Sequence, residues 1–191
     1  MTKGRLEAFS DGVIAILITI LVLELKVPHG TDFESLRPML PTFLTYVLSF
    51  VYLGIYWNNH HHLLHATSGV TGGILWANLH LLFWLSLIPF TTAWMGENHF
   101  AAVPTAAYGV VLFAAAIGYL ILEIAIIAHQ GKDSKLREAV GREWKGKVSV
   151  ACYLAGIALA FENHWISHGL YVLVALMWLV PDRRIESKLR E

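Results

Sequence analysis

The densest group of potentially reactive side chains is a run of four histidines in the string HHHLLH: His60, His61, His62 and His65. On a helix, His61 and His65 share one face, at the spacing that lets two imidazoles bind one metal ion. Membrane di-iron enzymes use such histidine boxes, but they need several boxes together with carboxylates. The other histidines (His29, His80, His99, His129, His164, His168) are mostly single. We therefore expect a polar structural cluster, with no metal, no cofactor and no catalytic residues, and keep a membrane metalloenzyme as the alternative.

Three carboxylates lie within or at the ends of strongly apolar stretches: Asp11, Glu24 and Glu123. A charge at the middle of a bilayer costs about 2.5 to 3.5 kcal/mol on insertion scales and usually marks function. Glu123 is expected either to pair with a nearby cation or to carry protons. A proton-coupled transporter or proton-permeable channel that uses Glu123 and the histidines is therefore a second functional class to test.

The composition of the chain indicates a membrane protein. Of its 191 residues 56% are hydrophobic and 15% are charged, and the mean hydropathy is +0.55. This is too apolar for a soluble domain of this length. The formal net charge is zero, which gives no basic field for nucleic acid. The single cysteine, Cys152, excludes a disulfide or a thiolate metal site within one chain.

Six apolar runs are long enough to be transmembrane helices, since a bilayer core requires roughly 20 residues. They cover approximately residues 7–26, 40–62, 72–95, 102–129, 147–162 and 165–181. The sequence therefore predicts an all-α membrane protein with a single six-span unit over residues 1–191. Two alternatives exist: the first run could be a signal peptide, and the short last two could form a hairpin that crosses incompletely.

The basic residues support an even number of spans. Lys and Arg concentrate in short cytoplasmic loops. If both termini are cytoplasmic, all but two of the 14 Lys and Arg residues, Lys26 and Arg37, lie on the cytoplasmic side. An odd number of spans would destroy this asymmetry. The connection between the fourth and fifth runs is expected to be a short cytoplasmic helix.

The first apolar run carries one helical stripe with little polarity. Gly12, Ile16, Thr19 and Leu23 recur at intervals of four, three and four residues, and Ile20 lies on the same broad face. Only Thr19 in this stripe is polar. Taken alone, the stripe is more typical of a surface that faces lipid or packs on another helix than of the wall of a water-filled pore.

The start of the same run carries a motif that is more specific. Arg5, Phe9, Ser10 and Asp11 spell R-x-x-x-F-S-D before the apolar string GVIAILITILVLELKVP. This resembles the signature helix of the transmembrane protein 175 family of potassium channels. The strings YWNNHHHLLH, NLHLLFWLSLIPFTT and PDRRIE resemble the same family at the corresponding positions, so the resemblance covers nearly the whole chain.

This resemblance implies a potassium-selective, leak-type channel, built in prokaryotes as a homotetramer in the plasma membrane. In the family the first helix of each unit lines a central pore, and no carbonyl filter loop is used; this sequence has no T-V-G-Y-G segment. Carried over by position, Ile16 becomes the narrow apolar constriction and Ile20 and Leu23 become further apolar layers. Thr19, with Ile16, becomes the selectivity residue. Potassium would be the permeant ion, with no cofactor and no nucleic-acid partner.

The polar residues at the start of the first run are expected to fix the rotation of that helix. In this hypothesis Arg5, Ser10 and Asp11, with Phe9 as an apolar anchor, bind polar side chains on neighbouring helices. The candidate partners are Trp57, His60, Asn78 and Trp84.

Overall fold

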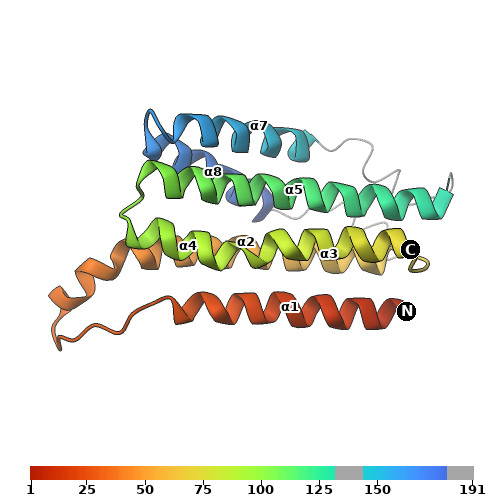
Figure 1. Ribbon diagram of the computed structural model, residues 1–191, viewed down its shortest axis with the longest axis horizontal. Coiled ribbons are helices and arrows are strands. Elements are labelled where there is room, and N and C mark those ends of the chain that lie inside the picture. The colour runs from red at the N-terminus through yellow and green to blue at the C-terminus, as the bar shows by residue number, and fades with distance from the viewer. Residues whose placement is uncertain (132–143, 180–191) are drawn as a thin grey trace.

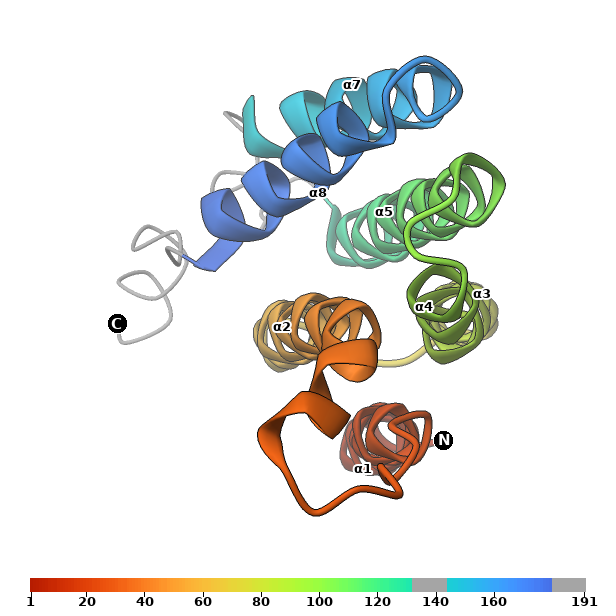
Figure 2. The ribbon, with the colours of Figure 1, turned by 90° about the vertical axis from the view of Figure 1, so that its left-hand side faces the viewer.

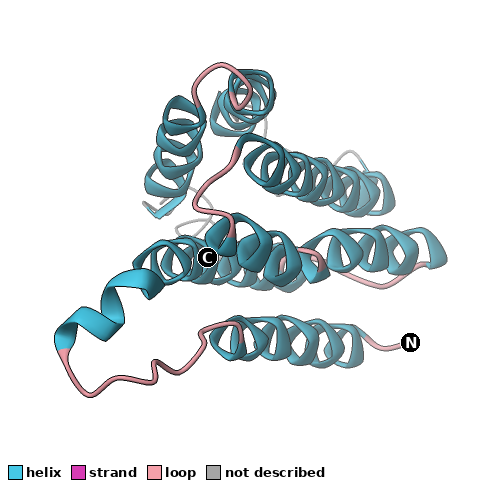
Figure 3. Ribbon diagram, turned by 60° about the vertical axis from the view of Figure 1, so that its left-hand side comes forward, coloured by secondary structure: helices cyan, strands magenta, loops and turns pink. Residues whose placement is uncertain are grey.

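The computed structural model describes residues 1–131 and 144–179, and its regular elements in these ranges are all helices (Figure 1; Figure 3). The chain begins with α1 (Lys3–Leu23), and the 3-10 helix η1 (Phe33–Met39) leads directly into α2 (Leu40–His65). The other helices are α3 (Gly72–Ser86), α4 (Ile88–Glu97), α5 (Ala102–Gln130), α7 (Trp144–Leu159) and α8 (His164–Leu179). The predicted all-α fold class is confirmed.

Within the described residues, four helical stretches are long and apolar enough to cross a membrane: Lys3–Leu23, Phe33–His65, Gly72–Glu97 and Ala102–Gln130. Helices α7 and α8 have 16 residues each. At 1.5 Å per residue the described part of each is about 24 Å long, against the roughly 30 Å of a bilayer core, and each borders residues that are not described. That these two helices cross the membrane stays a prediction. The expected cytoplasmic helix between α5 and α7, and most of the basic residues that set the orientation, lie outside the described residues.

Helix α1 lies at one edge of the bundle (Figure 2). It packs against α2, α3 and α4 with one side. Helix α5 lies between the α3–α4 pair and the α7–α8 pair and packs against all four of these helices. One long side of α1 is therefore left uncovered by the other described helices.

The third apolar run, expected as a span over residues 72–95, is one apolar helical stretch, Gly72–Glu97, that is interrupted at Leu87 and so divides into two helices. Helix α3 ends at Ser86 and α4 begins at Ile88, with Pro89 in its first turn. Proline cannot donate a backbone hydrogen bond, and its ring clashes with the carbonyl of the preceding turn. Beyond the break the helical pattern resumes, and Leu87 O accepts both the backbone N–H and the hydroxyl of Thr91, each at 3.1 Å. The break follows from a sequence signal, a proline inside an apolar helical run.

Gly109 on α5 and Gly156 on α7 make room for the buried ring of Tyr171 on α8. A Cβ atom added at Gly109 would overlap the Tyr171 hydroxyl, which donates to Thr105 O. We expect Gly109→Ala to destabilise the protein by about 1–3 kcal/mol, the usual cost of overpacking. Thermal unfolding in detergent checks this, with Gly169→Ala as the control because a Cβ there meets no atom within 4 Å. Equal stability of the two variants would contradict the prediction.

Candidate functional site

Helix α1 has two faces with different properties. Its buried residues, Leu6, Ser10, Ile14, Leu17 and Leu21, recur every three or four positions and face α2, α3 and α4. The opposite face carries the stripe singled out in the sequence. On that face Ile16 is 58% exposed and Leu23 is 78% exposed, and Phe9, Gly12, Thr19 and Ile20 are also exposed. The stripe therefore lies on the side of α1 that the described part of the chain leaves exposed.

Thr19 is the polar residue of this stripe, and its hydroxyl is oriented by its own helix. Thr19 Oγ1 donates to Ile16 O at 2.8 Å. Because the hydroxyl proton is used in this bond, the lone pairs of the oxygen remain available as acceptors. An acceptor oxygen on an exposed face is a group that can interact with a cation.

The buried face of α1 is held by a hydrogen-bonded triad that joins three helices. Asn78 Nδ2 on α3 donates to Ser10 Oγ on α1 at 3.0 Å, and His60 Nε2 on α2 lies 2.7 Å from Asn78 Oδ1. Since the amide nitrogen of Asn78 faces Ser10, its oxygen must accept, so His60 donates from Nε2. All three side chains are buried, at 0% to 1% exposure. A buried polar triad of this kind specifies how the three helices fit together.

Two further hydrogen bonds join α1 to α2 on the side of this triad. Trp57 Nε1 donates to Asp11 Oδ1 at 3.1 Å, and Lys3 Nζ donates to the carbonyl of His65. Just after the other end of α1, Lys26 forms an ion pair with Glu97, the last residue of α4. The hydrogen bond and the charge of Glu97 raise the pKa of Lys26. Helix α1 is thus bonded to α2 and α3 over its first half, which restricts rotation about its own axis, and an exposed ion pair joins the chain just after α1 to α4.

Three residues of the predicted network lie elsewhere. Trp84 Nε1 donates to His80 Nε2 on its own helix at 3.1 Å and does not reach α1. Phe9 is 48% exposed on the stripe face, so it is not a buried anchor within one chain. Arg5 is exposed and makes no hydrogen bond or ion pair with the described part of the chain. The bonds of Lys3 and Lys26 were not predicted, because no spacing in the sequence relates residues that far apart.

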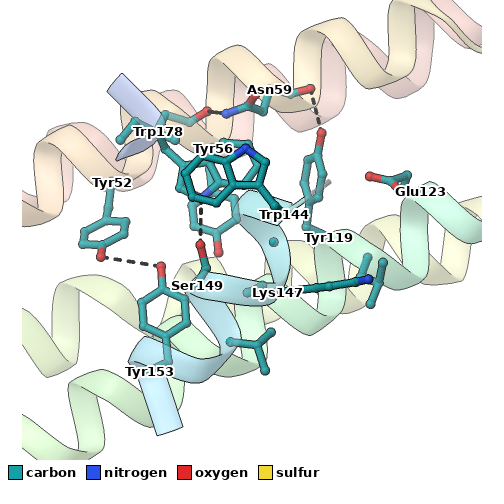
Figure 4. Close-up of a pocket in the computed structure, with 15 residues that line it drawn as sticks. Tyr52, Tyr56, Asn59, Tyr119, Glu123, Trp144, Lys147, Ser149, Tyr153 and Trp178 are labelled. Carbon is teal, nitrogen blue, oxygen red and sulfur yellow. Dashed lines mark hydrogen bonds between the residues drawn. The ribbon is translucent and has the colours of Figure 1, made fainter. Parts of the chain in front are cut away.

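The histidine cluster contacts the buried side of α1 through His60 and His65, whereas Glu123 lines a cavity to which α1 contributes no residue. The rings of His61 and His65 stack at 6.1 Å between centroids, and Trp57 stacks on His61. Within residues 1–131 and 144–179, no group of three His, Cys, Asp or Glu side chains is arranged to hold a metal ion. Glu123 on α5 is 2% exposed and lines a cavity between α2, α5, α7 and α8 (Figure 4).

Comparison with known proteins gives one family over the whole chain. Residues 5–89 match the family model described as endosomal/lysosomal potassium channel TMEM175. A potassium channel from Chryseobacterium sp. (strain P1-3) is 59% identical over 191 residues and covers 100% of both chains. An endosomal/lysosomal proton channel TMEM175 from Gallus gallus is 41% identical over 75 residues, which is 33% of this chain and 15% of that protein.

A solved structure agrees with this assignment. The crystal structure of a lysosomal potassium-selective channel TMEM175 homolog from Chamaesiphon minutus superposes with a TM-score of 0.81 at 31% sequence identity. The match covers 93% of this chain and 96% of that one. The family expected from the R-x-x-x-F-S-D string is thereby confirmed, and the chain belongs to the TMEM175 family.

Proposed function

We propose that the protein is a potassium-selective, leak-type ion channel assembled from four copies of this chain, with α1 of each copy lining a shared axis. The observation that carries the proposal is the contrast between the two faces of α1. One face is fixed by hydrogen bonds to α2 and α3, whereas the other presents an apolar stripe that no other residue in 1–131 or 144–179 buries. Four such stripes around an axis form a narrow apolar conduit. In this proposal both termini are cytoplasmic and the membrane is the plasma membrane of a prokaryote.

The side chains of the stripe have different roles in this pore. Ile16 forms the narrowest ring, and Ile20 and Leu23 add apolar layers toward the end of α1. A cation that passes an apolar ring loses water contacts and receives no carbonyl oxygens in exchange. Potassium is dehydrated at lower cost than sodium, so such a ring favours potassium. The hydroxyl oxygens of Thr19, one helical turn beyond Ile16, refine this preference.

Purified protein in liposomes tests the proposal. Potassium-loaded vesicles are expected to release potassium down its gradient without saturation, and sodium-loaded vesicles are expected to release sodium much more slowly. Chemical cross-linking of the same sample should yield a species of four chains. Saturable flux that requires a pH gradient would contradict the proposal and favour the proton-coupled transporter.

The relative from Gallus gallus, named a proton channel, makes proton permeability a second property to measure. Glu123 lines a cavity that lies away from the stripe, and no residue of α1 lines that cavity. We therefore place proton conduction, where it occurs, on the α1 axis. Acidification of potassium-free vesicles should then be blocked by the same α1 substitutions that block potassium flux and be unaffected by Glu123→Gln.

Removal of the Thr19 hydroxyl is expected to weaken selectivity with the pore intact. Thr19→Ala should lower the permeability ratio of potassium to sodium by about three- to ten-fold, which corresponds to ~1 kcal/mol. Bi-ionic reversal potentials measure the ratio. Thr45→Ala is the matched control, because Thr45 Oγ1 makes the same kind of bond, to Thr42 O, on α2. A retained ratio in Thr19→Ala would place the selectivity filter elsewhere.

A further inference from the structure

A cavity of about 720 Å³ lies between α2, α5, α7 and α8, apart from α1 (Figure 4). Trp144 at the start of α7 and Trp178 near the end of α8 lie on its wall, together with side chains from the second half of α2 and of α5. Small-molecule sites typically measure about 300–1,000 Å³ and are mostly apolar. The cavity is therefore large enough for a compact organic ligand.

Most polar groups on the wall are already bonded within the protein. Tyr52 donates to Tyr171 O at 2.6 Å, and Tyr119 donates to Asn59 O at 3.3 Å. Trp178 Nε1 donates to Ser149 Oγ at 2.9 Å. What these residues present to the cavity is the face of an aromatic ring. A sugar or a nucleotide, which needs many hydrogen bonds, does not fit this wall.

One polar group on the wall lacks a partner. Tyr56 is 8% exposed, and its hydroxyl makes no hydrogen bond with any residue that the structure describes. Figure 4 shows its ring reaching from α2 into the space beside Trp144, Trp178 and Tyr119. A buried tyrosine hydroxyl usually finds an acceptor. At the edge of the cavity Lys147 and Trp144 are exposed and supply two further donors. Tyr56, Lys147 and Trp144 are therefore donors that a ligand can use, whereas Glu123, the carboxylate that also lines the cavity, already interacts within the chain.

We propose that this cavity binds a lipophilic ring compound whose polar atoms are hydrogen-bond acceptors, with one acceptor oxygen on the Tyr56 hydroxyl. The ring stacks on the aromatic wall, and the oxygen takes the hydrogen bond that Tyr56 lacks. Two sources share this chemistry: neutral ketones or quinones, and aromatic carboxylates. Lys147 would distinguish them, because its ammonium group favours an anion.

The position of the cavity links it to α1 through a single helix. Tyr56 and Asn59 line the cavity, while their neighbours on α2, Trp57 and His60, bond to Asp11 and to the Asn78–Ser10 pair. A ligand that shifts or stiffens this turn of α2 acts on the groups that hold α1. The inference that a bound ligand changes conduction rests on the proposed function. The inference that the cavity binds a ligand does not.

Photolabelling tests the binding site directly. Benzophenone is a neutral aromatic ketone with one acceptor oxygen, and ultraviolet light cross-links it to nearby C–H bonds. We expect saturable labelling of peptides from α2, α5 and α7, found by mass spectrometry. Val150→Trp, which fills the cavity, should abolish it. Tyr56→Phe should raise the benzophenone concentration at half-saturation about five-fold, which is the effect of losing one net hydrogen bond.

The controls decide the result. Tyr46→Phe, the same substitution on α2 outside the cavity, should bind as the unmodified chain does. Labelling that does not saturate, or that Tyr56→Phe leaves unchanged, would overturn the proposal. If 4-benzoylbenzoate, the carboxylate analogue, labels the protein at lower concentration than benzophenone does, and if Lys147→Gln removes this difference, the ligand class is aromatic carboxylates. If the two compounds label equally well, the class is neutral carbonyl compounds.

Potassium flux in liposomes provides the second readout. Benzophenone should change the flux at least two-fold in the unmodified chain and in Tyr46→Phe, and Tyr56→Phe should need about five times more benzophenone for the same change. Saturable binding with no change in flux would overturn the claim that the ligand regulates conduction, and the claim that the cavity is a binding site would stand. Absence of any potassium flux would instead contradict the proposed function while the binding result stood.

Discussion

Replacement of Ile16 by asparagine is expected to raise potassium current about ten-fold or more and to reduce the preference for potassium over sodium. An apolar ring resists entry of a hydrated ion, and a carboxamide ring replaces part of the lost hydration. A lowering of the barrier by only ~1.4 kcal/mol gives a factor of ten. Single-channel recording in planar bilayers and bi-ionic reversal potentials measure both effects. Of the changes considered, this one should alter conduction most.

Ile124→Asn provides a control with the same chemistry. Ile124 on α5 is 55% exposed, close to the 58% of Ile16, but it lies on a helix that is not part of the proposed pore. The control should assemble and conduct as the unmodified protein does. If both variants behave alike, or if reversal potentials in Ile16→Asn are unchanged, Ile16 does not form the constriction.

The exposure of Ile16 follows from the arrangement of the helices and not from its own sequence. Its neighbours on α1 are apolar on both faces: Ile14 and Leu17 are as hydrophobic as Ile16 and Ile20. Hydrophobic periodicity therefore cannot say which face is covered. What separates the faces is the position of the polar residues, since Ser10 shares a face with Ile14 and Leu17 and turns it toward α2 and α3.

The long apolar runs predicted the helices well, because a segment in a membrane must satisfy its backbone groups internally and is helical wherever it is apolar for long enough. Partner choice among polar side chains was harder to predict. Ser10, His60 and Asn78 form the triad, but Trp84, equally plausible by sequence, bonds within α3 to His80. Which candidate side chain reaches α1 depends on how each helix is rotated about its own axis. A difference of one residue position along a helix changes the direction of a side chain by about 100°.

Other features had no local signal. The ion pair of Lys26 and Glu97 joins residues 71 positions apart, so no pattern within either segment predicts it. The cavity at Tyr56 results from four helices whose mutual positions the sequence does not state. The break before Pro89 did have a signal, and the uninterrupted hydropathy of the run obscured it.

The division of α1 into a fixed face and an open face explains why polar residues near its start matter for a pore. If α1 turned by one residue, Leu17 would replace Ile16 at the axis and Ser10 would leave Asn78. In the proposed pore the triad would therefore set which side chains surround the ion. The same groups that hold the fold together would define the constriction, so their loss should be visible first as a loss of assembly.

Asn78→Leu is expected to lower stability and tetramer yield strongly. Leucine has a similar volume, so packing is largely kept, but His60 and Ser10 lose their buried partner. Each unsatisfied group costs about 1–3 kcal/mol in a protein interior, and single hydrogen bonds in membranes are worth less, about 0.6 kcal/mol on average. The free energy of unfolding should therefore fall by about 1–4 kcal/mol in total. Each kcal/mol lowers the unfolding temperature by roughly 2–4 °C. Thermal unfolding in detergent and size-exclusion chromatography of cross-linked protein measure the two effects.

Asn98→Leu is the matched control, because Asn98 is exposed and bonds to Trp94 O on its own chain segment. It should leave the unfolding temperature within about 1 °C of the unmodified value, as surface changes do. The Asn78→Leu tetramers that survive should keep their potassium preference, because Ile16 and Thr19 are unchanged. Normal assembly combined with altered selectivity would show instead that Asn78 acts on the ion pathway and not on the seating of α1.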